Sequence, residues 1–177
     1  MIEVGIKENI RNVNNFPKKG INFKDITPIL LNPNLCKDIT EEFCNRVNHI
    51  KIDAVAGIES RGFLFGMQIA AQLQVPFIPI RKKGKLPYEK ISQQYTLEYD
   101  TAELEVHKDA IKSGWHVLVH DDLLATGGTA KASAELIQQL NGTVAGFSFI
   151  IELSFLKGKE TLSKYSDICH TLATYSE

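Results

Sequence analysis

Residues 117–129 read Val-Leu-Val-His-Asp-Asp-Leu-Leu-Ala-Thr-Gly-Gly-Thr, and no other stretch says as much about the fold. It begins with apolar, β-branched residues that are typical of a buried strand, and it ends in a short turn of small residues. An amphipathic helical pattern starts at Thr129. A strand that leads through such a turn into a helix is a phosphate-binding geometry, because backbone N–H groups and the helix dipole both face the anion.

Two adjacent carboxylates, Asp121 and Asp122, lie between this strand and its turn. Carboxylates beside a phosphate site repel the phosphate unless they bind something else, and a ribose diol or a hydrated Mg²⁺ ion would suit them. The alternative is an acid pair that is merely solvated, but strand, acids, turn and helix start all agree with a binding site. We therefore expect a ligand with a phosphate and a sugar diol, accompanied by a metal ion.

The composition is that of an ordinary globular protein. The 177 residues are 44% hydrophobic and 23% charged, which is enough for one domain with a sizeable core. The net charge of −1 gives no bulk attraction to nucleic acid or to an anionic membrane, so we expect neither as a partner. Three cysteines form no disulfide framework and no metal-binding spacing. Without a signal-peptide pattern or a long apolar run, the chain is expected to be cytoplasmic.

Strand-like and helix-like segments alternate along the chain. Strands are expected at 54–58, 76–80, 115–120 and 143–153, and helices at 2–13, 33–49, 62–73 and 130–140. Residues 95–99 and 104–107 could form a hairpin around Asp100, and a short helix and a final extended segment follow Lys157. This alternation predicts an α/β fold with a parallel sheet flanked by helices on both faces.

Three informative segments follow expected strand ends: residues 59–62, residues 81–83, and the acid pair with its turn. Ligands of such sheets bind outside the carboxyl ends of the strands, so these segments should form one site. The cations at 81–85 could be an ordinary solvated loop. They would also suit a diphosphate, because arginine offers a planar fork that matches phosphate oxygens.

Residues 121–129 resemble the signature of the type I phosphoribosyltransferases, in the form found in adenine phosphoribosyltransferases. Further segments resemble that family in consistent order, namely Phe-Pro-Lys-Lys-Gly-Ile-Asn-Phe-Lys-Asp-Ile at 16–26, residues 57–66, Arg-Lys-Lys-Gly-Lys-Leu-Pro at 81–87 and Leu-Glu-Tyr at 97–99. The resemblance implies one phosphoribosyltransferase domain over residues 1–177. A small N-terminal hood would occupy about 1–35, and a flexible catalytic loop about 82–104.

The resemblance also implies an activity and its partners. Adenine and phosphoribosyl diphosphate would give AMP and diphosphate, in purine salvage. Mg²⁺ would be bound through phosphoribosyl diphosphate rather than by direct protein ligands. The family further implies a homodimer.

Residue roles carried over from the family cover both substrates. Asp121 and Asp122 would hold the ribose, and the 5-phosphate would be held by Ala125, Thr126, Gly127, Gly128 and Thr129. Diphosphate would contact Ser60, Arg61, Gly62, Arg81, Lys82 and Lys85, and Arg61 could also close the base pocket.

The segment from Phe16 to Pro28 could, by its residues alone, be a loop that caps the core. The resemblance implies instead that it binds the purine. Phe23 would stack on the ring, backbone groups of Asn22 and Lys24 would bond the base edge, and Leu123 would pack on the other side.

Glu98 would act near the purine imidazole nitrogen when the loop that also carries Tyr99 closes. Two positions depart from the family pattern. Asp100 stands where the family usually has glycine, although aspartate tolerates a left-handed backbone better than most residues. His120 replaces an aliphatic residue, and it could be a core histidine or a modifier of Asp121.

Two alternatives remain open from the sequence. The first is a phosphoribosyltransferase for another base, such as hypoxanthine, guanine or xanthine, against which the hood and the two leucines after the acid pair argue. The second is a regulator that binds phosphoribosyl diphosphate without turnover, but the chain shows neither a basic balance nor an evident nucleic-acid-binding appendage.

Overall fold

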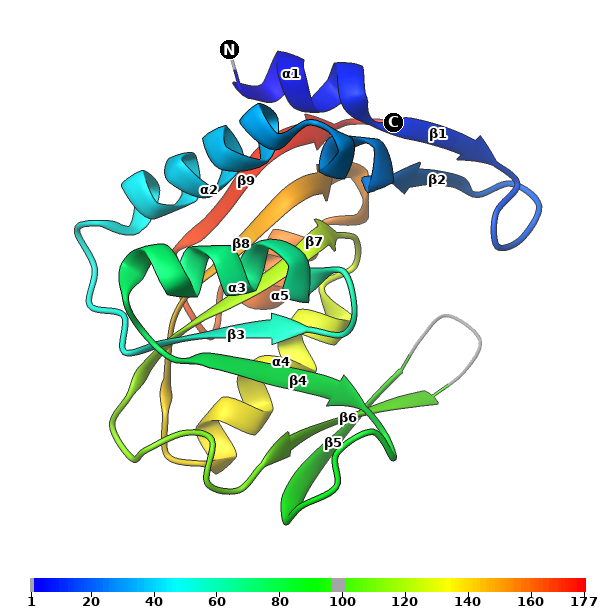
Figure 1. Ribbon diagram of the computed structural model, residues 1–177. Coiled ribbons are helices and arrows are strands. Elements are labelled where there is room, and N and C mark those ends of the chain that lie inside the picture. Colours follow the sequence, from blue (N-terminus) through cyan, green and yellow to red (C-terminus); the bar gives the residue numbers. More distant parts are fainter. Residues whose placement is uncertain (1, 97–100) are drawn as a thin grey trace.

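The computed structural model describes residues 2–96 and 101–177 and contains a seven-stranded sheet (Figure 1). The strand order across the sheet is β5-β6-β4-β3-β7-β8-β9. The five strands from β4 to β9 in this order pair in parallel, whereas β6 pairs antiparallel with both β4 and β5. The strands are β3 (Ala54–Ile58), β4 (Phe77–Lys82), β5 (Lys90–Thr96), β6 (Thr101–His107), β7 (His116–Leu124), β8 (Thr143–Leu153) and β9 (Cys169–Tyr175).

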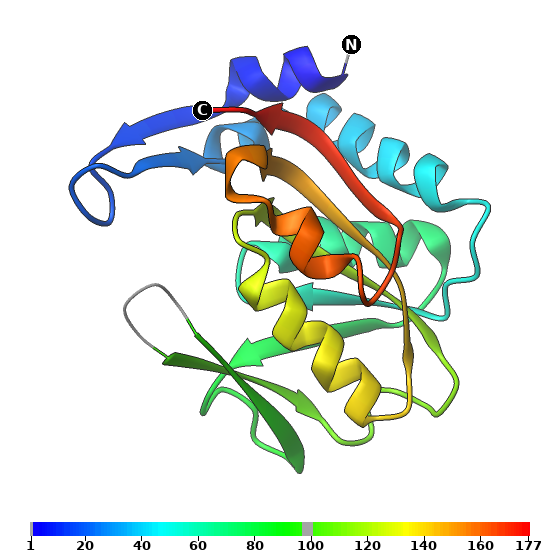
Figure 2. The same ribbon diagram turned by 180° about the vertical axis from the view of Figure 1, so that it is seen from behind.

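Helices cover both faces of this sheet, which confirms the expected α/β class. In Figure 1, α2 (Pro33–Val47) and α3 (Gly62–Leu73) lie in front of the sheet. Figure 2 shows α4 (Gly128–Gln139) and α5 (Gly158–Leu162) on the opposite face. The helix expected at 62–73 and the strand expected at 143–153 are confirmed at these bounds. The Asn32 side chain accepts a hydrogen bond from the Leu35 N–H at 3.1 Å and so caps the start of α2.

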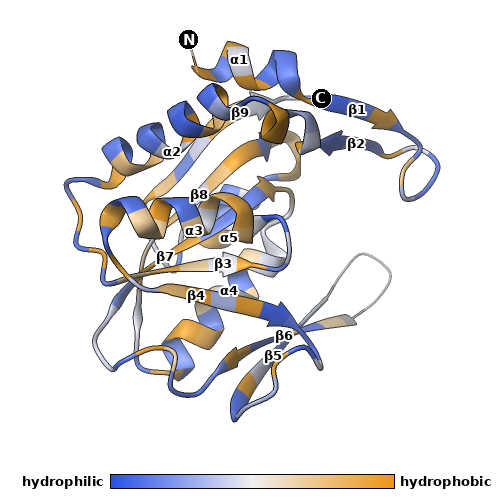
Figure 3. Cartoon of the chain, in the orientation of Figure 1, coloured by the Kyte–Doolittle hydropathy of each residue, from blue (hydrophilic) through white to orange (hydrophobic). Residues whose placement is uncertain are grey.

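Each face of the sheet packs a separate core. Val119 and Phe147 pack toward α4, and Leu118 packs with Phe43 and Phe65 on the side of α2 and α3. Because central parallel strands are buried on both faces, they carry nearly continuous apolar sequence. Figure 3 shows much of β4 and β8 coloured hydrophobic, whereas β1 and β2 are mostly hydrophilic.

The N-terminal region differs from the expected helix over residues 2–13. The helix α1 (Ile2–Asn9) ends early, and β1 (Arg11–Asn14) pairs antiparallel with β2 (Asn22–Asp25). The helical spacing of apolar residues was therefore misleading after Asn9, because cross-strand pairing with a distant segment overrode it. This two-stranded sheet projects from the top of the molecule in Figure 1, and the 3-10 turn η1 (Thr27–Leu31) joins it to α2.

The strand β7 is longer than expected and includes the acid pair. It continues to Leu124 because Asp121 pairs with Phe149 and Leu123 pairs with Ile151 of β8. The two carboxylates are thus carried by the hydrogen-bonded end of a central strand and not by a loop. No helix in the described part of the chain has the length and apolar character needed to cross a membrane.

Candidate active site

The turn between β7 and α4 depends on Gly127. This residue has a φ of +84°, and a side-chain carbon placed on it would lie 2.9 Å from the carbonyl oxygen of Gly158. The Thr161 hydroxyl donates to the Thr126 carbonyl at 2.9 Å, so α5 supports the turn from outside. Because α4 begins at Gly128, the free N–H groups of its first turn face the same region. A cavity of about 200 Å³ is lined by residues 121–130, Arg61 and Phe149.

The acid pair forms one wall of this cavity, which we call the phosphate cavity because of its position at the start of α4. Asp122 is only 3% exposed, and its backbone N–H donates to the Asp121 carboxylate at 2.9 Å. Burial, together with the neighbouring Asp122 carboxylate, raises the pKa of Asp121 well above its usual range. Burial also raises the pKa of Asp122, and the Arg61 guanidinium opposes that shift. Hydroxyl groups that donate hydrogen bonds to these two carboxylates would stabilise their negative charge.

Arg61 stands between the acid pair and the N-terminal sheet. Its Nε lies 3.1 Å from Asp122 Oδ2, an ion pair in which that oxygen makes no well-aligned hydrogen bond. Its guanidinium lies 4.9 Å from the centre of the Phe23 ring. The next residue, Gly62, lets this segment approach β7 closely, because a side-chain carbon there would lie 2.8 Å from the His120 carbonyl oxygen. The peptide bond between Glu59 and Ser60, just before Arg61, is cis.

A larger and mostly apolar cavity of about 550 Å³ opens on the other side of Arg61. All four residues expected to bind the base line it, namely Asn22, Phe23, Lys24 and Leu123. Arg61, Leu123 and Ala125 line both this base cavity and the phosphate cavity, so the two spaces adjoin. The Lys24 ammonium is turned elsewhere, since it donates to Asn12 Oδ1 at 2.6 Å. A role for Lys24 at the base would therefore fall to its backbone.

A family model described as a phosphoribosyl transferase domain matches residues 25–171. An adenine phosphoribosyltransferase of Cytophaga hutchinsonii is 49% identical over 175 residues, covering 99% of this chain and 97% of that protein. The chain belongs to the adenine phosphoribosyltransferase family.

Solved structures of this family have the same fold. A crystal structure of adenine phosphoribosyltransferase from Thermoanaerobacter pseudethanolicus matches with a TM-score of 0.94 at 46% identity, covering 99% of this chain and 100% of that chain. The enzyme of Saccharomyces cerevisiae, solved with adenine and an imino-altritol bisphosphate, matches with a TM-score of 0.89 at 40% identity, covering 97% of this chain and 98% of that chain. The type I phosphoribosyltransferase fold expected from the sequence is thereby confirmed.

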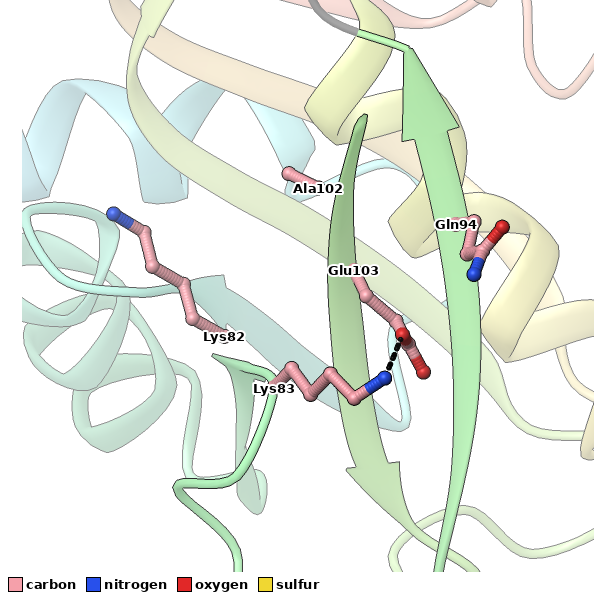
Figure 4. A pocket seen from close by; sticks show the side chains of 5 residues that line it. All are labelled: Lys82, Lys83, Gln94, Ala102 and Glu103. Carbon is pink, nitrogen blue, oxygen red and sulfur yellow. Dashed lines mark hydrogen bonds and ion pairs between the residues drawn. The ribbon is translucent and has the colours of Figure 1, made fainter. Parts of the chain in front are cut away.

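The cations expected to bind diphosphate lie at the end of β4. The Arg81 guanidinium lies against Glu59, with Nε 3.2 Å from its Oε2, and also donates to the Lys85 carbonyl at 3.1 Å. Figure 4 shows a neighbouring cavity of about 400 Å³, where Lys83 reaches Glu103 at 2.7 Å and the Lys82 side chain points away from that pair. The sheet thus brings Arg81, Lys82 and Lys85 to the edge that also carries the acid pair.

Two predicted residues cannot be located in the site. Glu98 and Tyr99 lie outside the described residues, as does Asp100. The strands that lead to them, β5 and β6, pair from Lys90 with His107 to Thr96 with Thr101, which agrees with the expected hairpin. The hairpin is anchored on α4, where the Gln139 amide donates to the Gln93 side-chain oxygen at 2.7 Å.

His120 lies fully buried in the core. Its Nδ1 is 2.9 Å from the Ser148 hydroxyl, and its ring stands edge-on to Phe43. Burial lowers the pKa of His120 to about 3, so the imidazole is neutral at physiological pH. The interpretation as a core histidine agrees with this geometry.

Sequence reasoning missed other residues of the site. Phe155 and Leu156 lie on η2 (Ser154–Leu156), directly after β8, and line the base cavity together with Ile21. Phe155 is 50% exposed, and an aromatic residue beyond the carboxyl end of a parallel strand was the signal available in the sequence. Glu59 lies in the segment 59–62 that was expected at the site, but its contact with Arg81 was not predicted.

Proposed function

We propose that this chain transfers the 5-phosphoribosyl group of phosphoribosyl diphosphate to adenine, giving AMP and diphosphate in purine salvage. One observation carries the proposal: an apolar cavity lined by Phe23 adjoins a polar cavity built on the acid pair and a helix N-terminus. A flat apolar base and a phosphorylated sugar that are to be joined need this arrangement. The family membership agrees with it.

In the proposed reaction, N9 of adenine forms a bond to the anomeric carbon of the ribose. The bond from that carbon to the diphosphate oxygen breaks, and its electron pair leaves with diphosphate. The proton that the base loses goes to the Glu98 carboxylate and from there to water. Because charge builds on the ribose ring and on the leaving group, positioning and electrostatic stabilisation should account for most of the rate.

The donor would be held at three points. Asp121 and Asp122 would accept hydrogen bonds from the ribose hydroxyls, and the pairing of β7 with β8 holds this end of the strand in the sheet. The 5-phosphate lies in the turn formed by Ala125, Thr126, Gly127, Gly128 and Thr129. The diphosphate lies against Ser60, Arg61, Gly62, Arg81, Lys82 and Lys85.

The base would lie in the cavity beside Phe23. Phe23 stacks on one face of the purine and Leu123 packs on the other, while backbone groups of Asn22 and Lys24 bond its edge. Closure of the region of about residues 82–104, which carries Glu98 and Tyr99, would exclude water that could otherwise hydrolyse the donor.

Mg²⁺ is the proposed cofactor, and the residues present fit it. In the described residues, no group of three or more histidine, cysteine or acidic side chains is arranged to hold a metal ion. The Asp122 Oδ2 atom nevertheless has no hydrogen bond within the part of the chain that the structure describes, and the pKa of Asp121 is raised, so a nearby cation would stabilise the charge of this acid pair. Mg²⁺ bound through the oxygens of phosphoribosyl diphosphate would neutralise the charge of the leaving group.

Incubation with phosphoribosyl diphosphate, Mg²⁺ and each purine base in turn, followed by chromatography, tests the proposal. We expect AMP from adenine and no nucleotide from hypoxanthine, guanine or xanthine. A nucleotide formed from another base would overturn the assignment of the base cavity. Binding of the donor without any product would overturn the enzymatic assignment in favour of a regulator.

We further propose that the protein works as a homodimer in the cytoplasm. The three cysteines are all free thiols, as expected in a reducing compartment. On α3, Leu64 and Met67 lie one turn apart and remain 40% and 54% exposed, so this face could bury apolar area in a dimer. Light scattering should give twice the mass of one chain, and Met67→Glu should shift it toward the monomer.

A further inference from the structure

We propose that Glu59 is a positioning residue: it holds the cationic segment (residues 81–85) in the conformation that binds diphosphate. This inference rests on the proposed binding of diphosphate by Arg81, Lys82 and Lys85. Glu59 itself is not expected to touch the ligand. Its carboxylate acts through Arg81 and through the backbone of Lys82.

Glu59 is fixed at the end of the sheet. Its backbone N–H donates to the Ile80 carbonyl at 2.9 Å, which continues the pairing of β3 with β4 by one residue. From there its carboxylate oxygen Oε2 accepts two bonds, one from the Lys82 N–H at 2.9 Å and one from Arg81 Nε at 3.2 Å. The Glu59 side chain is only 14% exposed, so water competes little for these contacts.

Two further carboxylates, those of Glu103 and Glu105, also contact the cationic segment. Glu105 accepts from the Gly84 N–H at 3.1 Å, and Lys83 forms its ion pair with Glu103. Figure 4 shows that the Lys82 side chain extends away from this pair. Throughout residues 2–96 and 101–177, no hydrogen bond or ion pair occupies the ammonium groups of Lys82 and Lys85. Carboxylates therefore bind the frame of the segment and leave two of its cations available.

Glu59 carries its negative charge at neutral pH. Burial opposes ionisation, but hydrogen bonds from the Lys82 N–H and from Arg81 outweigh it and lower the pKa of Glu59. An anion in this place has two opposite effects on a bound diphosphate. Charge repulsion through space weakens binding, whereas a prearranged Arg81 strengthens it, because less side-chain freedom is lost when the ligand arrives.

The sign of a mutational effect separates these two roles. In Glu59→Gln the amide oxygen can take the place of Oε2 and still accept from both the Lys82 N–H and Arg81, but the negative charge that strengthens both bonds is gone. Glu42→Gln is the matched control, because it removes the negative charge from a 2.7 Å ion pair between Glu42 and the Nε of Arg46 on α2, away from the site. Both variants lose one negative charge and replace an ion pair with an arginine by a neutral hydrogen bond.

Diphosphate affinity is measured by calorimetry in the presence of Mg²⁺, together with kcat and KM for phosphoribosyl diphosphate. For Glu59→Gln we expect about tenfold weaker diphosphate binding and a similar rise in KM, with kcat changed less. The control should bind like the wild type. Unchanged or tighter binding by Glu59→Gln overturns the proposal, because charge repulsion would then be the main effect of Glu59.

Variants of Arg81 give a second test that does not require Glu59→Gln to fold. Arg81→Lys keeps the charge but loses the fork that joins Glu59 to the Lys85 carbonyl, and it should bind diphosphate several-fold more weakly. In an Arg81→Ala background, Glu59→Gln should cause a smaller further loss than in the wild type, because only its bond from the Lys82 N–H remains. Wild-type affinity in Arg81→Lys overturns the positioning role. Wild-type affinity in Arg81→Ala overturns the diphosphate assignment as well, and AMP formation by the wild type tests the function separately.

Discussion

Asp121→Asn should stabilise the fold and weaken the site at the same time. The wild type holds two adjacent carboxylates at the end of β7, and burial together with Asp122 raises the pKa of Asp121. Asparagine has nearly the same shape, its side-chain oxygen can still accept from the Asp122 N–H, and its amide can donate to the Asp122 carboxylate. The substitution therefore removes a repulsion and adds a donor without opening a cavity.

The magnitude of the stability gain follows from linkage. Each unit by which the folded-state pKa exceeds the unfolded value corresponds to about 1.4 kcal/mol of destabilisation at neutral pH. One such unit would raise the Tm by roughly 3–5 °C in a chain of this size. The penalty exists above the raised pKa and disappears below the unfolded value near 3.8. The two proteins should thus differ in Tm at pH 7 and converge toward pH 4.

The effect on the donor has the opposite sign. If Asp121 accepts hydrogen bonds from the ribose, loss of its charge removes about 1.5–3 kcal/mol, the range for a hydrogen bond to a charged group. Donor affinity would fall roughly 10- to 100-fold. Calorimetry with phosphoribosyl diphosphate and thermal melts at several pH values measure both effects. Unchanged donor affinity would refute the ribose assignment, and a lower Tm at pH 7 would refute the account of charge repulsion.

Four further predictions address other parts of the site. Phe23→Ala should raise KM for adenine about tenfold, because it removes both the stacking surface and the contact of the ring with Arg61, and equal KM values would exclude a role of Phe23 in binding the base. Gly127→Ala forces a side chain into a φ of +84° and should cost about 1–3 kcal/mol, seen as a Tm lower by several degrees with weaker donor binding. Glu98→Gln should lower kcat roughly 100-fold with little change in donor affinity, and wild-type turnover would remove Glu98 from the mechanism. His120→Gln should flatten the pH dependence of Tm: the buried imidazole has a pKa of about 3, so wild-type stability is complete above pH 6.5 and is lost as pH falls toward 3, whereas parallel curves would contradict this burial effect.

Controls for these variants come from the chain itself. Phe16 lies edge-on to Phe23, but it does not line the base cavity, so Phe16→Ala should change KM for adenine much less than Phe23→Ala does. For Gly127→Ala, the comparison is Gly114→Ala. Gly114 also has a positive φ, at +81°, but it has no neighbouring atoms within 4 Å of an added side-chain carbon. Only the first of the two glycine variants should affect the donor.

Much of the fold could be predicted from local sequence. The helix at 62–73 and the strands at 54–58 and 143–153 were predicted at their observed bounds. Each segment keeps one apolar pattern, helical or strand-like, along its whole length, and residues typical of turns flank it. Residues 11–13 were assigned wrongly to a helix, because their partner strand begins at Asn22 and a local pattern does not contain it. The acid pair was placed after the strand for the same reason, since its pairing with β8 extends β7 to Leu124.

A turn suited to phosphate after an acid pair could be predicted without the structure, because strand, turn and helix start are continuous in the chain. The family could be predicted in the same way, through motifs that each lie within about a dozen residues. Other contacts became visible only in the folded chain: Arg61 lies between Asp122 and Phe23, Phe155 lines the base cavity, and Glu59 contacts Arg81. These contacts depend on the parallel sheet, because it brings the carboxyl ends of strands to one edge although long crossovers separate them in sequence.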